Sequence, residues 1–420
     1  MIRSMLAGAA LVSAATPVPA RPVQVPAPAA QALPAAEALA RRYVAEGRTP
    51  GIVLAIGAPN GVRFAQAGRG GPDPAAAAVT PDTLWRIYSM TKPITGMAAM
   101  MLVEDGRLRL DQPVSDFIPA FRSMRVLVDP ERSLASRPAR SPITVRQLMT
   151  HSSGLGYSIN ARGPLLDAYV KAGLTPFAVN AAVEAQVRPA RPTTLAEFAN
   201  RAAAQPLVAE PGTRWHYSMG LDVLGRVIEV ASGMPFDRFV QTRMFAPLGM
   251  TSTYWSVPAS EAGRLATTVT YLGGRTVPLD PAATSVFLQP PSFPYGGAGL
   301  VSSARDYDRF LAMLANRGTL DGRRVMKPET VTLGMSNLLP AGVFFTGGGT
   351  RMGFGAGGSV TLADAPGMAR GSFGWSGAAG TNAWVDPVRQ RRAIAMVNYF
   401  PGEHWPLRAD LAAAVAADRP

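Results

Sequence analysis

The chain has 420 residues, of which 47% are hydrophobic and 16% charged, and this composition excludes a wholly disordered protein. The lack of cysteine excludes a disulfide scaffold, a cysteine-ligated zinc site and a cysteine nucleophile, and three histidines do not favour a histidine-rich metal centre. The net charge of +13 comes from arginines spread along the chain rather than from a basic run interleaved with aromatic residues, so we expect no nucleic-acid partner.

Residues 1–34 are predicted to be a signal peptide followed by a Pro- and Ala-rich linker. Arg3 precedes an apolar run from Met5 to Ala15, and small residues that suit a cleavage site follow it. The run is too short to cross a membrane, and no later stretch approaches the roughly 18 apolar residues of a membrane span. We therefore expect an exported protein, periplasmic or secreted, without an integral membrane span. The alternative is a disordered Ala-rich start.

The folded part is predicted to begin near Ala35 with a helix over residues 35–47. Two runs rich in β-branched and small residues follow, Gly51–Gly57 and Val62–Gly68, with the turn sequence Ala58-Pro59-Asn60-Gly61 between them. Such a pair of runs around a turn predicts a β-hairpin.

The far end of the chain also carries strands. Thr381–Asp386 and Arg392–Phe400 are predicted strands joined by a polar turn, and a closing helix is expected near Leu407–Ala416. Strands at both ends with helices between them predict an α+β fold, in which the two ends share one sheet and a helical region is inserted into it.

The middle of the chain is mostly helical in pattern. One helix is expected to end at Ser232-Gly233, and another to begin at Ser303, where Asp306 completes a capping-box pattern. The apolar positions of the first of these helices recur at helical spacing: Leu221, Leu224, Val227, Ile228 and Ala231. We predict an α/β domain over residues 35–120 and 295–420 and a mostly helical domain over residues 121–294.

The chemistry begins at Ser89 and Lys92. Pro93 fits only the first turn of a helix, so Ser89 is expected at the N-terminus of the apolar helix that follows. Positions i and i+3 share a helix face, which places the Lys92 amine near the Ser89 hydroxyl. The helix N-terminus and a desolvated pocket disfavour a protonated amine, and a neutral lysine can take the serine proton. Lys92 is also one of only three lysines in the chain.

Two further segments can complete such a site. In Trp215-His216-Tyr217-Ser218-Met219 the tyrosine lies in a predicted loop before a helix, where its phenol can shuttle a proton. The Gly-rich segment from Gly371 to Thr381 precedes a strand, and its small residues let backbone N–H groups approach a ligand, as an oxyanion hole requires. Taken alone, Tyr217 is also compatible with a half-buried tyrosine whose hydroxyl only forms a hydrogen bond. The segment from Gly371 to Thr381 is, taken alone, also compatible with an ordinary Gly-rich loop.

Taken together, these segments resemble a known superfamily. The order SMTK, HSSGL (151–155), YSM, GGAGL (296–300) and GWSGAAG (374–380) is similar to that of the serine hydrolases of the class C β-lactamase and penicillin-binding-protein superfamily. Within it the chain most resembles the β-lactamase-like, or family VIII, carboxylesterases. The resemblance implies a β-lactamase/transpeptidase-like fold, with an antiparallel sheet flanked by helices and an inserted mostly helical domain.

The resemblance also implies roles for individual residues. Ser89 matches the acylated nucleophile, Lys92 the general base, and Tyr217 the proton relay to the leaving group. The backbone N–H groups of Ser89 and Ala378 match the oxyanion hole. No metal and no organic cofactor is implied, and the expected partner is a small-molecule ester.

Two departures from the β-lactamase pattern bear on the substrate. The asparagine expected two residues after the tyrosine is Met219 here, and the Lys-Thr-Gly box is Trp375-Ser376-Gly377. The missing amide and ammonium would have held the amide and carboxylate of a β-lactam. We therefore expect Met219, Trp375, Ser376 and Gly377 to bind a neutral, partly hydrophobic ester.

A rival nucleophile is Ser376. Gly374-Trp375-Ser376-Gly377-Ala378 nearly matches a nucleophile elbow, and Asp386 and His404 follow in the order of an α/β-hydrolase triad. A strand rather than a helix is predicted after it, and the spacings are short, so we favour Ser89. His151 is expected to fix a turn rather than to catalyse.

Three alternatives to an esterase remain open in the sequence. They are a β-lactamase or D-amino-acid peptidase or transpeptidase, an acyltransferase that uses the same acyl-enzyme, and a penicillin-binding-like module without turnover. The sequence does not determine the natural substrate or the oligomeric state.

Overall fold

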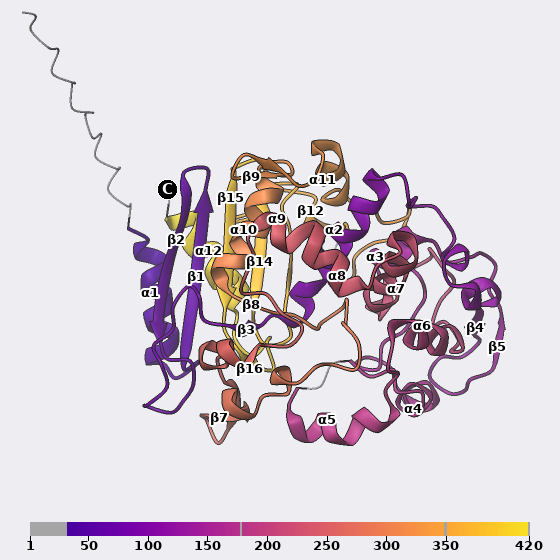
Figure 1. Cartoon of the computed structure of the whole chain (residues 1–420), viewed down its shortest axis with the longest axis horizontal. Coiled ribbons are helices and arrows are strands. Elements are labelled where there is room, and N and C mark those ends of the chain that lie inside the picture. The colour runs from indigo at the N-terminus through magenta and orange to yellow at the C-terminus, as the bar shows by residue number, and fades with distance from the viewer. Residues whose placement is uncertain (1–31, 177–178, 348–350, 419–420) are drawn as a thin grey trace, which may run out of the picture. The chain divides into compact units, whose positions relative to one another are not determined.

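The computed structural model describes residues 32–176, 179–347 and 351–418, and in it both ends of the chain build one sheet. Each neighbouring pair of its seven strands is antiparallel, in the order β11-β12-β13-β14-β15-β1-β2. In Figure 1 the indigo N-terminal strands lie beside the yellow C-terminal ones. The strands are β1 Gly51–Ala58, β2 Gly61–Gly68, β11 Met352–Phe354, β12 Ser359–Thr361, β13 Phe373–Ser376, β14 Asn382–Asp386 and β15 Arg391–Met396.

This arrangement confirms the predicted α+β class with an antiparallel sheet made from both chain ends. The predicted signal peptide and most of the linker, residues 1–31, lie outside the described residues. The predicted domain boundaries near residues 120 and 294 stay a prediction.

Helices cover both faces of the sheet. α1 Pro34–Ala45 and α12 Leu407–Ala417 pack on one face, and α10 Ala304–Ala315 contacts the strands from the other. Strand β1 is buried along its whole length because its alternate side chains enter two different cores. Ile52, Leu54 and Ile56 join the core under α1 and α12, whereas Val53 and Ala55 join the larger core of the rest of the protein.

The last predicted strand is broken in two. Strand β15 ends at Met396, and β16 Tyr399–Phe400 leaves the large sheet to pair with β6 Thr268–Leu272, which also pairs with β7 Arg275–Asp280. The break falls at Asn398, whose side chain accepts a hydrogen bond from Arg86 N and donates one to Arg86 O. Asn398 and Arg86 are 312 positions apart in the chain. The break in the strand thus coincides with a contact to a distant residue, and the local sequence gives no sign of it.

The helix that follows Ser89 lies in the centre of the molecule. A 3₁₀ turn, Tyr88–Met90, leads directly into α2 Thr91–Glu104, whose residues are buried from Thr91 to Leu102. α2 packs against α7 Gly220–Ser232 and α11 Pro328–Gly334. α7 ends at Gly233 as predicted, in the left-handed conformation that favours glycine.

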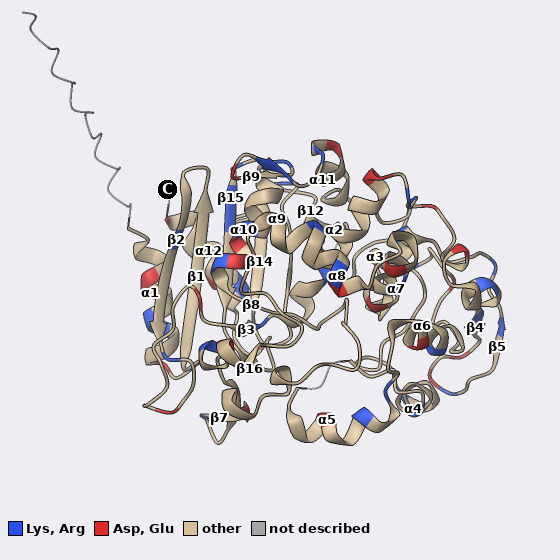
Figure 2. Cartoon of the chain, in the orientation of Figure 1, with Lys and Arg blue, Asp and Glu red and all other residues tan. Residues whose placement is uncertain are grey.

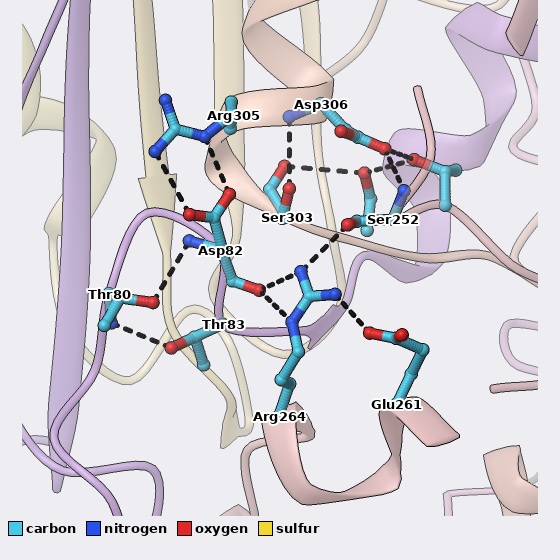
Figure 3. Close-up of polar contacts among 11 residues, drawn as sticks. Thr80, Asp82, Thr83, Ser252, Glu261, Arg264, Ser303, Arg305 and Asp306 are labelled. Atoms are coloured by element: carbon cyan, nitrogen blue, oxygen red, sulfur yellow. Dashed lines mark hydrogen bonds and ion pairs between the residues drawn. The ribbon is translucent and has the colours of Figure 1, made fainter. Parts of the chain in front are cut away.

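The entry to α10 differs from the prediction in one detail (Figure 3). Ser303 caps the helix by accepting the Asp306 N–H, as the capping-box pattern predicts. The Asp306 carboxylate does not return the bond, since it accepts hydrogen bonds from Ser252 N and Thr253 Oγ1. The acidic residue therefore ties the helix to a distant loop.

Shorter helices and strands make up much of the rest of the chain between β2 and β11. In Figure 2 the basic and acidic segments are interspersed over the helices and strands. Within the described residues, no helix is both long and apolar enough to cross a membrane. The remaining elements are α3 Val145–Met149, α4 Gly163–Lys171, α5 Ala181–Val187, α6 Leu195–Ala203, α8 Phe236–Val240, α9 Ala246–Leu248, β3 Trp85–Arg86, β4 Arg125–Leu127, β5 Ser136–Pro138, β8 Val301–Ser302, β9 Thr319–Leu320 and β10 Arg323–Arg324.

The packing of α2 yields a test of the fold. A Cβ atom at Gly96 would lie closer than 3.0 Å to the Ala356 carbonyl oxygen, whereas a Cβ at Gly263 would meet nothing within 4 Å. We expect Gly96→Ala to lower the free energy of unfolding by about 1–3 kcal/mol, because α2 and the loop at Ala356 must separate. Gly263→Ala is the control, and thermal or urea unfolding is the measurement. Equal stability of the two variants would contradict this close packing.

Candidate active site

Three predicted site residues meet at one point. Lys92 Nζ lies 3.1 Å from Ser89 Oγ, and the Tyr217 hydroxyl donates a hydrogen bond of 2.8 Å to the same oxygen. Lys92 Nζ also lies 4.6 Å from the centre of the Tyr217 ring. Ser89 is therefore within proton-transfer distance of both an amine and a phenol.

The first turn of α2 positions the lysine. Its side chain is 0% exposed and donates a hydrogen bond of 2.7 Å to the Gly297 carbonyl. The GGAGL segment holds this turn at further points, because Thr95 Oγ1 donates to Gly296 O and Leu300 N donates to Thr91 Oγ1. A Cβ at Gly297 would lie closer than 3.0 Å to a carboxylate oxygen of Asp222. Glycine there permits the close approach of the two segments.

Sequence reasoning missed Asp222, which belongs to this network. Its carboxylate is buried, at 2% exposure, and accepts a hydrogen bond of 2.8 Å from Gly297 N. Burial raises the pKa of the Asp222 carboxyl to about 6, against the lowering effects of the Lys92 charge and of the Gly297 N–H. The one sequence signal for Asp222 was the presence of an acidic residue within the apolar helical pattern that follows Tyr217.

The loop that carries Tyr217 is fastened to the HSSGL segment. His151 has a left-handed backbone, with φ of 56°, and its carbonyl accepts a hydrogen bond from His216 N. Its Nδ1 accepts the Ser218 N–H at 3.1 Å, and burial holds the pKa of His151 well below its ordinary value. The His151 ring packs 4.6 Å from that of Tyr217, centre to centre. His151 thus fixes a turn, and its ring supports Tyr217.

The Gly-rich segment from Gly371 to Thr381 is part strand and part turn, and it leads directly into strand β14. Trp375 and Ser376 lie in β13, and only residues 377–381 turn into β14. Gly377 N donates to Thr381 O, and a Cβ at Gly377 would collide with the Ile87 carbonyl. This contact brings the turn against the residues that precede Ser89.

A cavity of about 530 Å³ opens over Ser89. Tyr217, Phe345 and Trp375 form an aromatic wall, with the Trp375 ring centre 5.8 Å from that of Phe345 and 6.0 Å from that of Tyr217. Residues predicted to bind substrate or form the oxyanion hole also line it: Ser89, Trp375, Ser376, Gly377 and Ala378. Further lining residues had no sequence signal: Ile159, Phe345, Gly347, Met352, Ser359, Met368 and Arg408.

Met219 does not line this cavity. It is 1% exposed and caps the N-terminus of α7, where its N–H donates to the Gly156 carbonyl. Its position holds the Tyr217 loop against residue 156 and offers substrate no surface.

The rival triad is not assembled. Ser376 Oγ lies 2.5 Å from Asn382 Oδ1 and 3.3 Å from Arg408 Nη1. Asp386 lies four residues farther along β14 than Asn382, or about 13 Å at strand spacing. Its carboxylate accepts the N–H groups of Ala369, Val388 and Arg389. His404 is exposed and stacks on Tyr271.

In the part of the chain that the structure describes, no three acidic or histidine residues are grouped as metal ligands would be.

Known proteins are similar to this chain in sequence and in fold. A family model described as Beta-lactamase matches residues 36–417. Esterase EstB of Burkholderia gladioli is 32% identical over 360 residues, which cover 80% of this chain and 83% of EstB. Acyltransferase calJ of Penicillium decumbens is 28% identical over 79% of this chain and 78% of its own. The solved structure of EstCE1, described as a hydrolase with promiscuous acyltransferase activity, has a TM-score of 0.74 and 25% identity, covering 91% of this chain and 98% of EstCE1.

Asp222 makes stability depend on pH in a defined direction. Between its ordinary pKa of 3.8 and its folded pKa of about 6, the unfolded chain ionises this carboxyl while the folded protein keeps the proton. Folding stability therefore falls as pH rises through this window, and an amide at the position escapes the loss. The free energy of unfolding of Asp222→Asn, relative to wild type, should rise by up to about 3 kcal/mol between about pH 4 and pH 7.

Urea unfolding of both proteins across this range measures the difference. The amide oxygen introduced by Asp222→Asn can still accept the Gly297 N–H, so the comparison changes mainly the ionisable proton. Parallel pH curves for the two proteins would contradict a buried, titrating Asp222.

Proposed function

Because this chain belongs to the beta-lactamase family and is a serine hydrolase, we propose that it cleaves carboxylic esters through an acyl-enzyme on Ser89. The observation that carries the proposal is the convergence of Lys92 and Tyr217 on Ser89 Oγ at 3.1 and 2.8 Å. The earlier resemblance to the β-lactamase-like carboxylesterases is confirmed by the family match and by the esterase relatives.

In acylation, Ser89 Oγ attacks the ester carbonyl and its proton passes to the Lys92 amine. Negative charge builds on the carbonyl oxygen, and the N–H groups of Ser89 and Ala378 are the donors proposed for it. The C–O bond to the alcohol then breaks. The alcohol leaves with the Tyr217 proton, which the phenol recovers from the Lys92 ammonium.

In deacylation, a second oxygen nucleophile attacks the Ser89 ester. Tyr217 and Lys92 take its proton and return one to Ser89 Oγ, so the site ends as it began. Water gives the acid, and an alcohol gives a new ester. Acyl transfer is the second candidate function, supported by the description of EstCE1 and by the acyltransferase calJ.

An ester suits this cavity better than a β-lactam. The wall next to Ser89 is the Trp375 ring, where the β-lactamase pattern has an ammonium group. Met219 lies inside the fold where that pattern has an amide. Without those two polar groups the binding energy of an anionic bicyclic amide falls. A neutral, partly apolar ester loses nothing by their absence.

Labelling identifies the nucleophile. We expect a fluorophosphonate probe to modify Ser89, as read by peptide mass spectrometry, and Ser89→Ala to lose p-nitrophenyl butyrate hydrolysis by at least about ten-thousand-fold. Nitrocefin turnover on the same sample should be negligible. Labelling at Ser376 would overturn the mechanism. Nitrocefin turnover equal to ester turnover would favour a β-lactamase. A single stable adduct without turnover would favour a penicillin-binding-like module.

Tyr217 provides a second test. Removing its hydroxyl in Tyr217→Phe leaves the ring packing and removes the proton relay, so kcat for the ester should fall by about 10²- to 10³-fold. Tyr254→Phe is the matched control, because its hydroxyl donates to Thr251 O away from the cavity. Steady-state kinetics at equal protein stability measures the effect. Equal kcat values for the two variants would exclude the phenol from the reaction.

A further inference from the structure

Sulfur in this protein is confined to methionine. The chain has 18 methionines and no cysteine, so a peroxide that reaches it finds thioethers and no thiol. A thioether that an oxidant can reach is converted to a sulfoxide, which is polar where the methionine was apolar. Burial therefore decides which methionines are open to this reaction.

Burial divides the methionines into two unequal groups. Within the described part of the chain, only Met234, Met352 and Met368 are partly exposed. The others are buried: Met90, Met97, Met100, Met101, Met124, Met149, Met219, Met244, Met250, Met313, Met326, Met335 and Met396. Two of the three accessible thioethers, Met352 and Met368, line the cavity that holds Ser89. Accessible sulfur is thus concentrated at the candidate active site.

Strand β11 positions Met352 beside the aromatic wall. Met352 and Phe354 are two positions apart in this strand, so their side chains share one of its faces. The Phe354 ring lies 5.1 Å, centre to centre, from the ring of Trp375, which belongs to that wall. The Met352 thioether therefore extends the apolar surface that the cavity offers to a substrate.

A turn brings Met368 to the same cavity. Ala365 and Met368 exchange two backbone hydrogen bonds, of 2.9 and 3.0 Å. Glycine suits position 367, because its φ is 68° and a Cβ there would lie closer than 3.0 Å to the Ala412 carbonyl oxygen of α12. Met368 lines both the cavity of Ser89 and an adjoining one. Its side chain therefore lies where the two cavities meet.

Oxidation would change the chemistry of these walls. The sulfur lone pair attacks one oxygen of hydrogen peroxide, the O–O bond breaks, and the second oxygen leaves as water with both peroxide protons. Sulfur is oxidised and peroxide is reduced. The new sulfoxide oxygen accepts hydrogen bonds from water. An apolar ester group that covers it removes this water without replacing the hydrogen bonds, and binding weakens.

We propose that Met352 and Met368 are modification sites, at which oxidation by hydrogen peroxide lowers the affinity of the catalytic cavity for apolar esters. Reduction by a thiol-dependent methionine sulfoxide reductase reverses it: the sulfoxide oxygen leaves as water while two thiols become a disulfide. The proposal rests on the ester-cleaving function proposed above and concerns the regulation of the same site. Ser89, Lys92 and Tyr217 are unchanged, so the effect falls on KM rather than on kcat.

Peptide mass spectrometry after graded peroxide treatment tests the accessibility of each sulfur. Met352, Met368 and Met234 should each gain one oxygen before the buried methionines do. Met234 follows the C-terminal cap of α7 and does not line the cavity of Ser89. It is therefore the internal control for an exposed methionine away from that cavity.

Ester kinetics on the same samples test the consequence. The KM for p-nitrophenyl octanoate should rise by about tenfold on oxidation, the effect of one polar group left without a partner in an apolar contact. The KM for p-nitrophenyl acetate, whose acyl group is short, should change by less than about twofold, as should kcat for both esters. Methionine sulfoxide reductases A and B with dithiothreitol should restore the original KM.

Leucine variants assign the effect to particular residues. Leucine has nearly the volume of methionine and no sulfur to oxidise. Peroxide should leave KM unchanged in the double variant Met352→Leu with Met368→Leu, and each single variant should show part of the rise. Met234→Leu is the matched control and should respond as wild type does. Each variant is compared with its own untreated sample, so that a shift in its basal KM does not enter the comparison.

Three results would overturn the proposal. They are a lack of oxidation at Met352 and Met368 under conditions that oxidise Met234, an unchanged KM when both are oxidised, and an equal rise of KM in the double variant. Failure of the esterase function would show differently, as a lack of turnover before peroxide is added. Calorimetric titration of the octanoate ester into Ser89→Ala, with and without oxidation, then decides: equal affinities would refute the proposal.

Discussion

The burial of the Lys92 amine is the constraint on which the site depends. A lysine removed from water requires polar partners at fixed places, and here they are the Gly297 carbonyl, Ser89 Oγ and the nearby Asp222 carboxylate. Each partner comes from a different part of the chain. The polar contacts of the Lys92 amine therefore bring three segments together: the GGAGL segment, the start of α7 and the 3₁₀ turn before α2.

The sheet supplies the other half of the site, through a glycine that lets two segments lie close together. β13 and β14 turn at residues 377–381, and this turn lies against Ile87 because Gly377 has no side chain. Ser89 follows two residues later. The antiparallel register of two C-terminal strands thus places Ala378 and Trp375 around a serine that belongs to the N-terminal half of the chain.

Charge is used in two ways in this arginine-rich protein. Most buried guanidinium groups pair with internal carboxylates and join distant elements, as Arg86 joins β3 to β7 through Asp280. Such pairs specify geometry more than they add stability, because the desolvation cost offsets much of the attraction. Arg408 is partly exposed and instead donates a hydrogen bond to a neutral group, the Ser376 hydroxyl.

The amino-acid sequence by itself determined what depends on neighbours in the chain. The hairpin at residues 51–68, the helices after Ser89 and before Gly233, and the shared face of Ser89 and Lys92 all follow from local spacing. Tyr217 lies 128 residues from Ser89 and could be proposed only from its motif and the family resemblance. Tertiary structure alone brought Asp222 to Lys92, buried Met219, broke the last strand at Asn398 and placed Arg408 beside Ser376. These contacts join segments far apart in the chain, and no local periodicity records which distant side chain will lie opposite when the two ends close into one sheet.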